Sequence, residues 1–230
     1  MEAKIKKIQT VFFTRNFNIP NDVFKASFLT RLNGYSSQIF NGQPQMLPIP
    51  NDAPQEFPRF ILSSSDNMFN CNISLLRTDI FYNIPDLATE SNEQLLEKQK
   101  TNSQNIFSFL IREGIGVNRI GFIIVAEKAL GAEEGDALSY LRNNFIRDNK
   151  LNNPKELVIN YNRASQSENF EMNNLITVNT KENTSIIIQI DINTLAERMN
   201  GVDFTLENFY EIISYAIRES QVFSDNFPNI

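Results

Sequence analysis

The chain of 230 residues contains no histidine, no tryptophan and only one cysteine. Without histidine it cannot form a Ser-His-Asp or Cys-His catalytic pair, a histidine-ligated zinc site or a histidine-based pH switch. The single cysteine, Cys71, excludes an intrachain disulfide and a multi-thiolate metal site. Because Cys71 lies on the apolar side of an alternating segment, we expect a buried, unreactive thiol.

Long apolar runs and nucleotide-binding motifs are also missing. No stretch approaches the roughly 18–20 consecutive apolar residues of a membrane-spanning helix. Residues 1–13 lack the apolar core and the small-residue cleavage site of a signal peptide. We therefore expect a cytoplasmic protein that does not bind membranes. There is no P-loop pattern, and Gly114-Ile115-Gly116 precedes a strand, which is the wrong context for a dinucleotide-binding loop.

The charge balance is acidic. The chain has 21 basic and 27 acidic residues, a net charge of −6 and an isoelectric point near 4.9. Its densest basic group, Lys4, Lys6 and Lys7, is too short to follow a phosphate backbone. This composition disfavours nucleic acid as a partner.

Hydrophobic periodicity predicts an α+β fold with a mainly antiparallel sheet of about six to seven strands and four main helices. Asn21 is placed to cap the first helix, which Asn33-Gly34 would end with a left-handed residue. Ser91 and Gln94 form a capping-box pattern at the start of the second helix. The polar middle of that helix, residues 97–105, predicts that it leaves the surface of the core. Thr205 is placed to cap the last helix.

Several strands are predicted from the same periodicity. Residues 118–127 are almost continuously apolar, which predicts a strand buried on both faces. Residues 156–163, 172–180 and 185–192 predict an antiparallel meander, followed by a short helical turn near 194–200.

Residues 57–83 are the segment around which we expect the sheet to be built. Their pattern predicts a short strand, a polar turn near Ser64 and a long second strand. The alternation along the long strand reverses at Leu75-Leu76. A strand that changes faces needs a bulge, or cover on both sides.

Arg77 and Asp79 lie beyond this reversal, two residues apart and therefore on the same face. A charge pair within a sheet must be satisfied by its own members, by neighbouring strands or by a bound molecule. Two interpretations stay open. The pair is either structural, as an internal ion pair or an exposed end of the sheet, or it is a polar anchor in a cleft between sheet and helix. Arg59, on the preceding strand, would face the same region.

Residues 35–56 predict a long loop that four prolines keep extended and semi-rigid. A loop of this length is either functional or packs across the sheet as an arm. Tyr35 and Phe40 lie in it, and we expect both rings to be exposed and available to a partner.

Acidic residues at two places in the chain each allow a structural and a functional interpretation. Glu133, Glu134 and Asp136 precede a predicted helix, where they would either complement the helix dipole or hold a divalent cation. Asp191 and Asn193 follow an apolar strand, where the carboxylate would cap a helical turn or take part in catalysis. We favour the structural role for both groups and predict no catalytic residue, metal site or cofactor.

The order of elements also fits a duplication. The first strands start near residues 5 and 118, the first helices near 21 and 134, and the last helices near 91 and 205. This spacing predicts two halves, residues 1–116 and 117–230, that pack around one core. A coincidence of common α+β ordering would explain it equally.

Two segments carry a resemblance. The pattern Pro48-x-Pro50, Pro54, Phe57-Pro58-Arg59-Phe60, Ser64/Ser65, Ile73-Ser74 and Arg77-x-Asp79 resembles a sporadically distributed bacterial family of uncharacterised proteins. The segment from Asp191 to Phe227 is similar to the same family. The resemblance covers residues 48–83 and 185–227, and it implies no reaction.

Together these features predict a non-catalytic cytoplasmic interaction protein. It would bind another protein, or itself as a homo-oligomer, in a toxin-neutralising, defence-associated or chaperone-like role. The alternative is a small-ligand-binding protein or an enzyme that uses arginine and carboxylate groups in a sheet–helix cleft, with or without a divalent metal. The candidate binding residues are Arg59, Arg77, Asp79, Tyr35 and Phe40.

Overall fold

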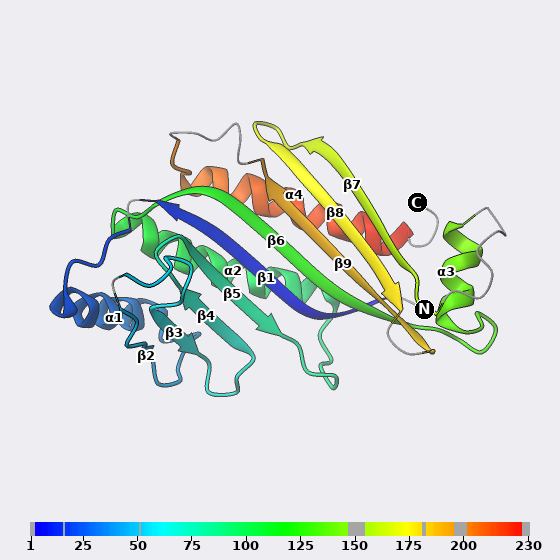
Figure 1. The fold of residues 1–230 in the computed structure, drawn as a ribbon, viewed down its shortest axis with the longest axis horizontal. Helices are drawn as coiled ribbons and strands as arrows, with labels where there is room; N and C mark the ends of the chain where they lie inside the picture. Colours follow the sequence, from blue (N-terminus) through cyan, green and yellow to red (C-terminus); the bar gives the residue numbers. More distant parts are fainter. Residues whose placement is uncertain are drawn as a thin grey trace.

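A computed structural model of the chain has an α+β fold, in which one antiparallel sheet runs through the molecule (Figure 1). It describes residues 3–15, 17–50, 52–146, 155–180, 183–195 and 202–226. The nine strands in this part are β1 (Lys4–Arg15), β2 (Gln45–Met46), β3 (Phe60–Ser63), β4 (Phe69–Ile73), β5 (Arg77–Asn83), β6 (Gly116–Ala129), β7 (Val158–Gln166), β8 (Glu171–Thr180) and β9 (Ser185–Thr194). Their order in the sheet is β2-β3-β4-β5-β1-β6-β9-β8-β7.

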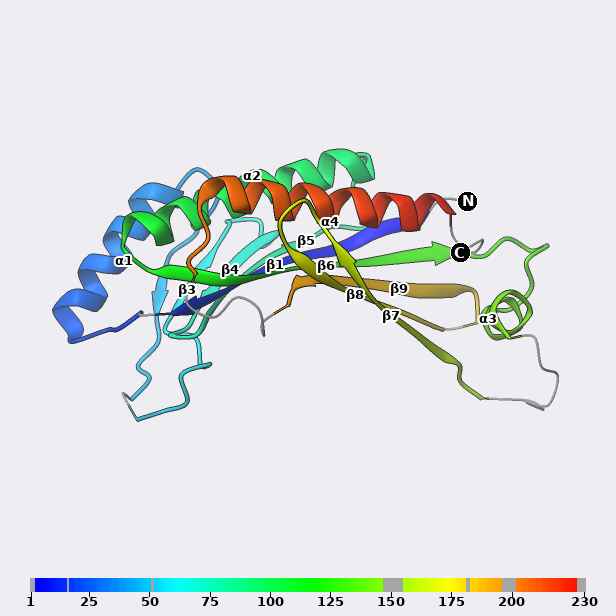
Figure 2. The same cartoon turned by 90° about the horizontal axis from the view of Figure 1, so that it is seen from above.

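The helices cover one face of this sheet. α1 (Asp22–Ser36), α2 (Asn92–Arg112) and α4 (Leu206–Asn226) lie on the same side, and α3 (Ala137–Phe145) lies at the far end beside β8 (Figure 2). We call the side under α1, α2 and α4 the covered face and the opposite side the open face.

The core fills the space between the covered face and the helices. Phe12 of β1, Phe107 of α2 and Phe209 of α4 form its centre, with ring centroids 5.0–6.1 Å apart. All three rings are buried. Aromatic contacts of this kind add stability beyond the buried area. Because the rings come from β1, α2 and α4, they join the first and last parts of the chain directly.

The sheet has nine strands rather than the six or seven predicted, in part because the predicted long strand is two strands. β4 and β5 form a hairpin, and the reversal of alternation at Leu75-Leu76 is its turn. Ser74 closes this turn without glycine. Its Oγ accepts from the backbone N–H of Arg77 (3.0 Å) and of Leu76 (3.3 Å), and its own N–H donates to the carbonyl of Arg77 (2.9 Å). Serine hydroxyls form such turns by mimicking backbone hydrogen bonds.

The prediction that the middle of α2 leaves the core is wrong. Gln99 and Ser103 are fully buried against the sheet. Gln99 Nε2 donates to Thr10 Oγ1 and to the carbonyl of Ile80, both at 3.0 Å, and Ser103 Oγ donates to Thr10 Oγ1 at 2.7 Å. The helix stays on the core because Thr10 of β1 accepts hydrogen bonds from the polar side chains in the middle of α2.

Helix starts agree with the sequence better than helix ends. Ser91 and Gln94 form the predicted capping box, and Asn21 Oδ1 accepts from the N–H of Phe24 at 2.8 Å. Thr205 Oγ1 accepts from the N–H of Asn208 at 3.3 Å. α1 continues through Gly34 to Ser36, so the predicted left-handed ending at Asn33-Gly34 is wrong.

The predicted meander is confirmed as β7, β8 and β9, whereas the helical turn predicted near 194–200 falls largely outside the described residues. The prediction that residues 118–127 are buried on both faces is wrong. Side chains of β6 alternate between buried positions on the covered face and half-buried positions, such as Ile123 and Val125, on the open face.

The two halves of the sheet have matching strand orders. β1 pairs with β5, which continues to β4 and β3; β6 pairs with β9, which continues to β8 and β7. Thr10 pairs with Ile80, and Phe122 pairs with Ile192, so the same offset of 112 residues relates both partners (10 to 122, 80 to 192). Thr10 and Phe122 are themselves paired. The division at residue 116 stays a prediction, and the halves share the central strands.

Candidate functional site

The open face of the central strands carries an unusual group of side chains. Register places Val11 opposite Asp79 of β5 and Gly121 of β6, so Phe81 and Ile123 lie diagonally beside it. We define the central patch as five apolar residues on this face: Val11, Phe13, Phe81, Ile123 and Val125. Val11 is 5% exposed, and the other four are half-buried.

Polar residues replace this apolar character on the outer strands. β4 presents Asn70 and Asn72 to the open face. On the other side of the sheet, β7 presents Asn160 there, and β8 presents Thr177 and Asn173. Antiparallel sheets with one solvated face usually carry polar residues there. Most positions of the outer strands follow this rule, with Ile61 of β3, Val158 of β7 and Leu175 of β8 as apolar exceptions. The centre of the sheet departs from it, because five apolar side chains lie together there.

Cations lie over both aromatic rings of the central patch. The Nζ of Lys7 is 4.7 Å from the centroid of Phe81, and the guanidinium carbon of Arg119 is 4.5 Å from that of Phe13. Both distances are within the range of a cation–π interaction. The apolar centre is therefore bordered by positive charge.

On one side of the patch, Arg77 and Asp79 form the ion pair that the sequence predicts as one of two alternatives. Arg77 Nε lies 2.8 Å from Asp79 Oδ2, and Gln9 Nε2 donates to Asp79 Oδ1 at 2.9 Å. Asp79 is 6% exposed, whereas Arg77 is exposed. The carboxylate is thus satisfied within the sheet, and the guanidinium keeps a side toward solvent.

On the other side of the patch, Asp191 occupies the position that matches Asp79 at the same offset of 112 residues. Asn193 Nδ2 donates to Asp191 Oδ1 at 3.1 Å, and Arg119 Nη2 donates to Asn193 Oδ1 at 2.9 Å. Arg119 Nε is buried without a hydrogen-bond partner among the described residues. Each half of the sheet therefore supplies a carboxylate, an amide that binds it and an arginine.

The other predicted site residues do not join this group. Arg59 is 4% exposed and donates to the carbonyls of Pro50 (2.8 Å) and Ala53 (3.3 Å). It therefore fixes the proline-rich loop to the sheet. Tyr35 is 39% exposed, and its ring packs 5.8 Å from that of Phe109. The expectation that Phe40 is exposed is wrong: it is fully buried in the main core, because the chain turns back after α1 and the N–H of Phe40 donates to the carbonyl of Ser36.

The predicted cleft does not bring Arg59 together with Arg77 and Asp79. A cavity of about 320 Å³ is lined by Arg59, Lys25 and Leu75, together with the segment Asn18–Pro20, but Arg77 and Asp79 do not line it. Lys25 is paired with Asp22 at 2.9 Å. The cavity and the central patch are separate features.

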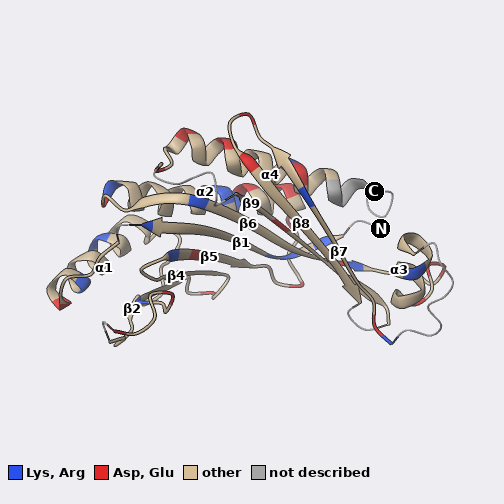
Figure 3. Cartoon of the chain, turned by 45° about the horizontal axis from the view of Figure 1, so that its top comes forward, with Lys and Arg blue, Asp and Glu red and all other residues tan. Residues whose placement is uncertain are grey.

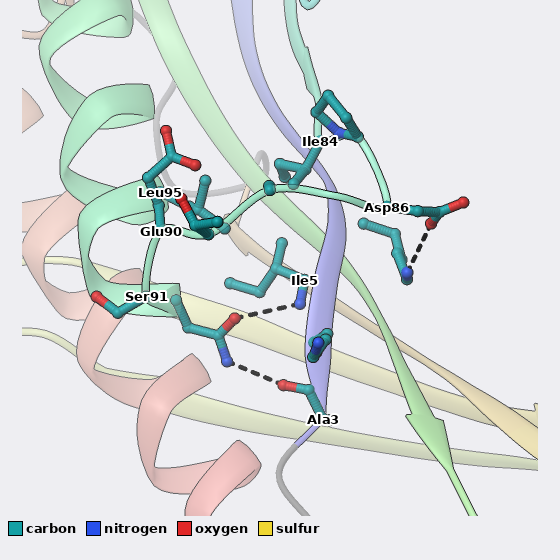
Figure 4. A pocket seen from close by; sticks show the side chains of 13 residues that line it. Ala3, Ile5, Ile84, Asp86, Glu90, Ser91 and Leu95 are labelled. Carbon is teal, nitrogen blue, oxygen red and sulfur yellow. Dashed lines mark hydrogen bonds and ion pairs between the residues drawn. The ribbon is translucent and has the colours of Figure 1, made fainter.

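A larger cavity, of about 510 Å³, lies where β1 meets the start of α2 (Figure 4). Asn92 bridges the two, since its Oδ1 accepts from the N–H of Ile5 (3.2 Å) and its Nδ2 donates to the carbonyl of Ala3 (2.9 Å). Lys6 pairs with Asp86 at 2.7 Å on the rim. These polar groups have protein partners and extend the hydrogen bonding of β1 beyond the end of β5.

Asp136 has the structural role that the sequence favours for the acidic group before α3, whereas the turn that Asp191 was predicted to cap falls largely outside the described residues. Asp136 caps α3 by accepting from the N–H of Ser139 at 2.9 Å, and this hydrogen bond lowers its pKa. Glu134 accepts from the N–H of Gly131 and pairs with Lys128 at 2.9 Å; these contacts lower the pKa of Glu134. In the described ranges, no three Cys, Asp or Glu side chains gather closely enough to hold a metal ion.

Cys71 is fully buried on the covered face, and burial raises the pKa of its thiol. Gln9, Phe13 and Arg119 are functional candidates that the sequence analysis missed. The one signal for them is Arg119, a charge within an otherwise apolar strand, which a strand buried on both faces would not carry.

No protein-family model matches the chain, and a search of curated proteins finds no relative. Of the helices in the described ranges, none has the length and apolar character needed to span a bilayer.

Proposed function

We propose that this chain is a non-catalytic interaction protein that binds a partner protein through the open face, with the central patch as the core of the contact. The observation that carries this proposal is the distribution of apolar side chains. Phe, Val and Ile gather on the open face of β5, β1 and β6, while the outer strands carry mostly polar residues there, with single apolar side chains such as Leu175 between them.

The composition of the patch and its border supports a protein partner. Contact surfaces between proteins combine an apolar centre with a polar rim and are enriched in aromatic residues and arginine. Here Phe13 and Phe81 lie in the centre, and Arg77 and Arg119 lie on the rim. The rim also carries the carboxylates Asp79 and Asp191, so its charge is balanced rather than uniformly basic, which favours a protein over nucleic acid.

The test is affinity capture from the native host with the wild-type chain and with a Phe13→Ala/Phe81→Ala variant. The two rings border Val11 and carry cations on their faces, so their loss removes the centre of the contact. We expect the partner that the wild type retains to bind the variant at least about tenfold more weakly, in line with aromatic residues at interface centres.

Leu87→Ala is the matched control, because Leu87 is 92% exposed and lies away from the patch, between β5 and α2. It should retain the partner fully. Equal binding of the double variant and the wild type, with unchanged thermal melting of both, would rule out the open face as the contact.

A second candidate function, binding of a small anionic ligand, is supported by the cavity that Arg59 and Lys25 line. Both residues line one space of about 320 Å³, a size at the lower end of known ligand sites. A thermal-shift screen with phosphate and carboxylate compounds tests it. A stabilised melting transition that Lys25→Met removes would support it, and an unchanged transition with every compound would exclude it.

A further inference from the structure

The two edges of the sheet differ in how they are protected. β2, at one edge, has two residues and lies between Pro44 and Pro48. Short strands and flanking prolines prevent an edge from pairing with other chains. β7, at the other edge, has nine residues, contains no proline and carries a single charge, Arg163 (Figure 3).

The side chains of β7 are open to solvent along its length. All of them except Ile159 and Ser165 are exposed, and Tyr161 is 50% exposed. β8 is the only neighbour of β7 in the described sheet. A long edge strand with exposed apolar and amide side chains and almost no charge is a template for pairing with another strand.

The hairpin that joins β7 to β8 identifies the backbone groups at the free edge. The N–H of Ser167 donates to the carbonyl of Phe170 at 2.9 Å. Hydrogen-bonded pairs alternate with non-hydrogen-bonded pairs from that point. The residues that direct their N–H and C=O groups away from β8 are therefore Val158, Asn160, Asn162, Ala164 and Gln166.

We propose that β7 pairs antiparallel with β7 of a second copy of this chain, about a two-fold axis at Asn162. This register uses the whole strand, because Val158 then faces Gln166 of the second copy and Asn160 faces its Ala164. Every outward-directed backbone group finds a partner, in about ten hydrogen bonds at two per hydrogen-bonded pair.

The side chains favour a second copy in this register. Tyr161 lies opposite Arg163 of the second copy, and both are on the covered face, where Arg163 pairs with Glu219 of α4. An aromatic ring and a guanidinium attract each other, whereas an axis at Arg163 would bring two like charges together. An axis at Tyr161 would leave Ser165 and Gln166 unpaired.

Asn162 on the axis lies on the open face with an amide that both donates and accepts, so it can bond to its own copy. The chain has a net charge of −6, yet β7 carries no acidic residue, so two copies meet at this edge without repulsion between carboxylates. The pairing extends the open face across both copies and is independent of the partner bound at the central patch.

The first test is the mass of the full chain in solution, measured by analytical ultracentrifugation at several concentrations. The wild type should form a dimer. Asn162→Lys brings two ammonium groups together on the axis and should weaken dimerisation at least tenfold. Asn173→Lys, on the same face one strand further in, is the matched control and should leave the dimer intact. A wild type that stays monomeric at 100 μM and above, or a dimer that Asn162→Lys leaves intact, would overturn the proposal.

The second test reports the register by disulfide cross-linking. Paired Cα atoms on the axis lie about 5.5 Å apart, within the reach of a disulfide. Oxidised Asn162→Cys should therefore form a covalent dimer. Asn160→Cys should not, because its own copy lies four residues along the strand, about 13 Å away. Cross-linking of Asn160→Cys but not of Asn162→Cys would contradict this pairing, and native Cys71 is buried and does not compete.

Discussion

At the scale of single residues, Thr10 shows how a polar side chain joins a helix to the sheet. It is fully buried on the covered face of β1, and its Oγ1 accepts hydrogen bonds from Gln99 and Ser103 of α2. Valine has nearly the same shape and a high strand propensity, so strand preference alone would predict that Thr10→Val is harmless.

We expect the opposite result, because Thr10→Val leaves two buried donors without an acceptor. The free energy of unfolding should fall by about 1–3 kcal/mol, the range for an unsatisfied buried polar group. Urea denaturation measures it. Thr177→Val, on the open face of β8, is the control and should change stability by about 0.5 kcal/mol or less. A Thr10→Val protein as stable as the wild type would show that these hydrogen bonds contribute nothing net.

The residues of the candidate site were only partly predictable. Arg77 and Asp79 were found because two charges in a strand pattern need partners, and the structure pairs them. Gln9 and Arg119 were missed because their importance depends on which strands lie beside β1 and β6. Phe40 looked exposed because it follows a helix and precedes four prolines, but local sequence does not show that the loop folds back into the core.

At the scale of elements, the hairpin of β4 and β5 shows where pattern reasoning failed. Alternation over residues 69–83 predicted one strand with a reversed face, whereas two strands with a three-residue connection produce the same pattern. The turn at Ser74 has no glycine or proline to mark it, and the serine hydroxyl replaces them. A side chain that caps its own turn leaves little trace in the sequence.

Glu211 of α4 ties that helix to the β7–β8 hairpin. It accepts from Ser167 Oγ at 2.6 Å and from the N–H and side chain of Asn169, each at 2.7 Å. Burial alone would raise the pKa of Glu211, but these hydrogen bonds outweigh burial and hold the pKa below its ordinary value of 4.5. A group whose pKa is lower in the folded state stabilises the fold above its unfolded pKa and loses that effect in acid.

We therefore expect Glu211→Gln to lower the melting temperature at pH 7 and to lose this difference as the pH falls below about 4.5. Thermal denaturation at pH 7, 4.5 and 3 measures it. Glu207→Gln, an exposed position one turn earlier in α4, controls for the change in net charge. A difference in melting temperature between Glu211→Gln and the wild type that stays the same at pH 7, 4.5 and 3 would contradict the role of the carboxylate.

At the scale of the whole molecule, the predicted halves meet along their longest strand pairing. β1 and β6 pair from Lys4 to Arg15, and Phe12 and Phe107 of the first half pack on Phe209 of the second. Separation of the halves would expose these rings and leave β1 and β6 each with one neighbouring strand instead of two. Matching strand order thus coexists with a single shared core.

We expect fragments 1–116 and 117–230 to be unfolded or aggregated when produced alone, and to regain sheet structure when refolded together. Circular dichroism with thermal melting, applied to each fragment and to the equimolar mixture, measures this. Cooperative melting of either fragment by itself would show that the halves are independent domains.

The sequence by itself determined the α+β class, the four main helices, the capped helix starts and the exclusion of histidine chemistry, since each of these depends on neighbouring residues or on composition. Only the tertiary structure decided the number of strands, the burial of Gln99 and Phe40, and the meeting of Arg77, Asp79, Gln9 and Arg119 around one patch. These depend on which strands pair and on which face the helices cover. Contacts between residues far apart in the chain set both, and no local pattern encodes them.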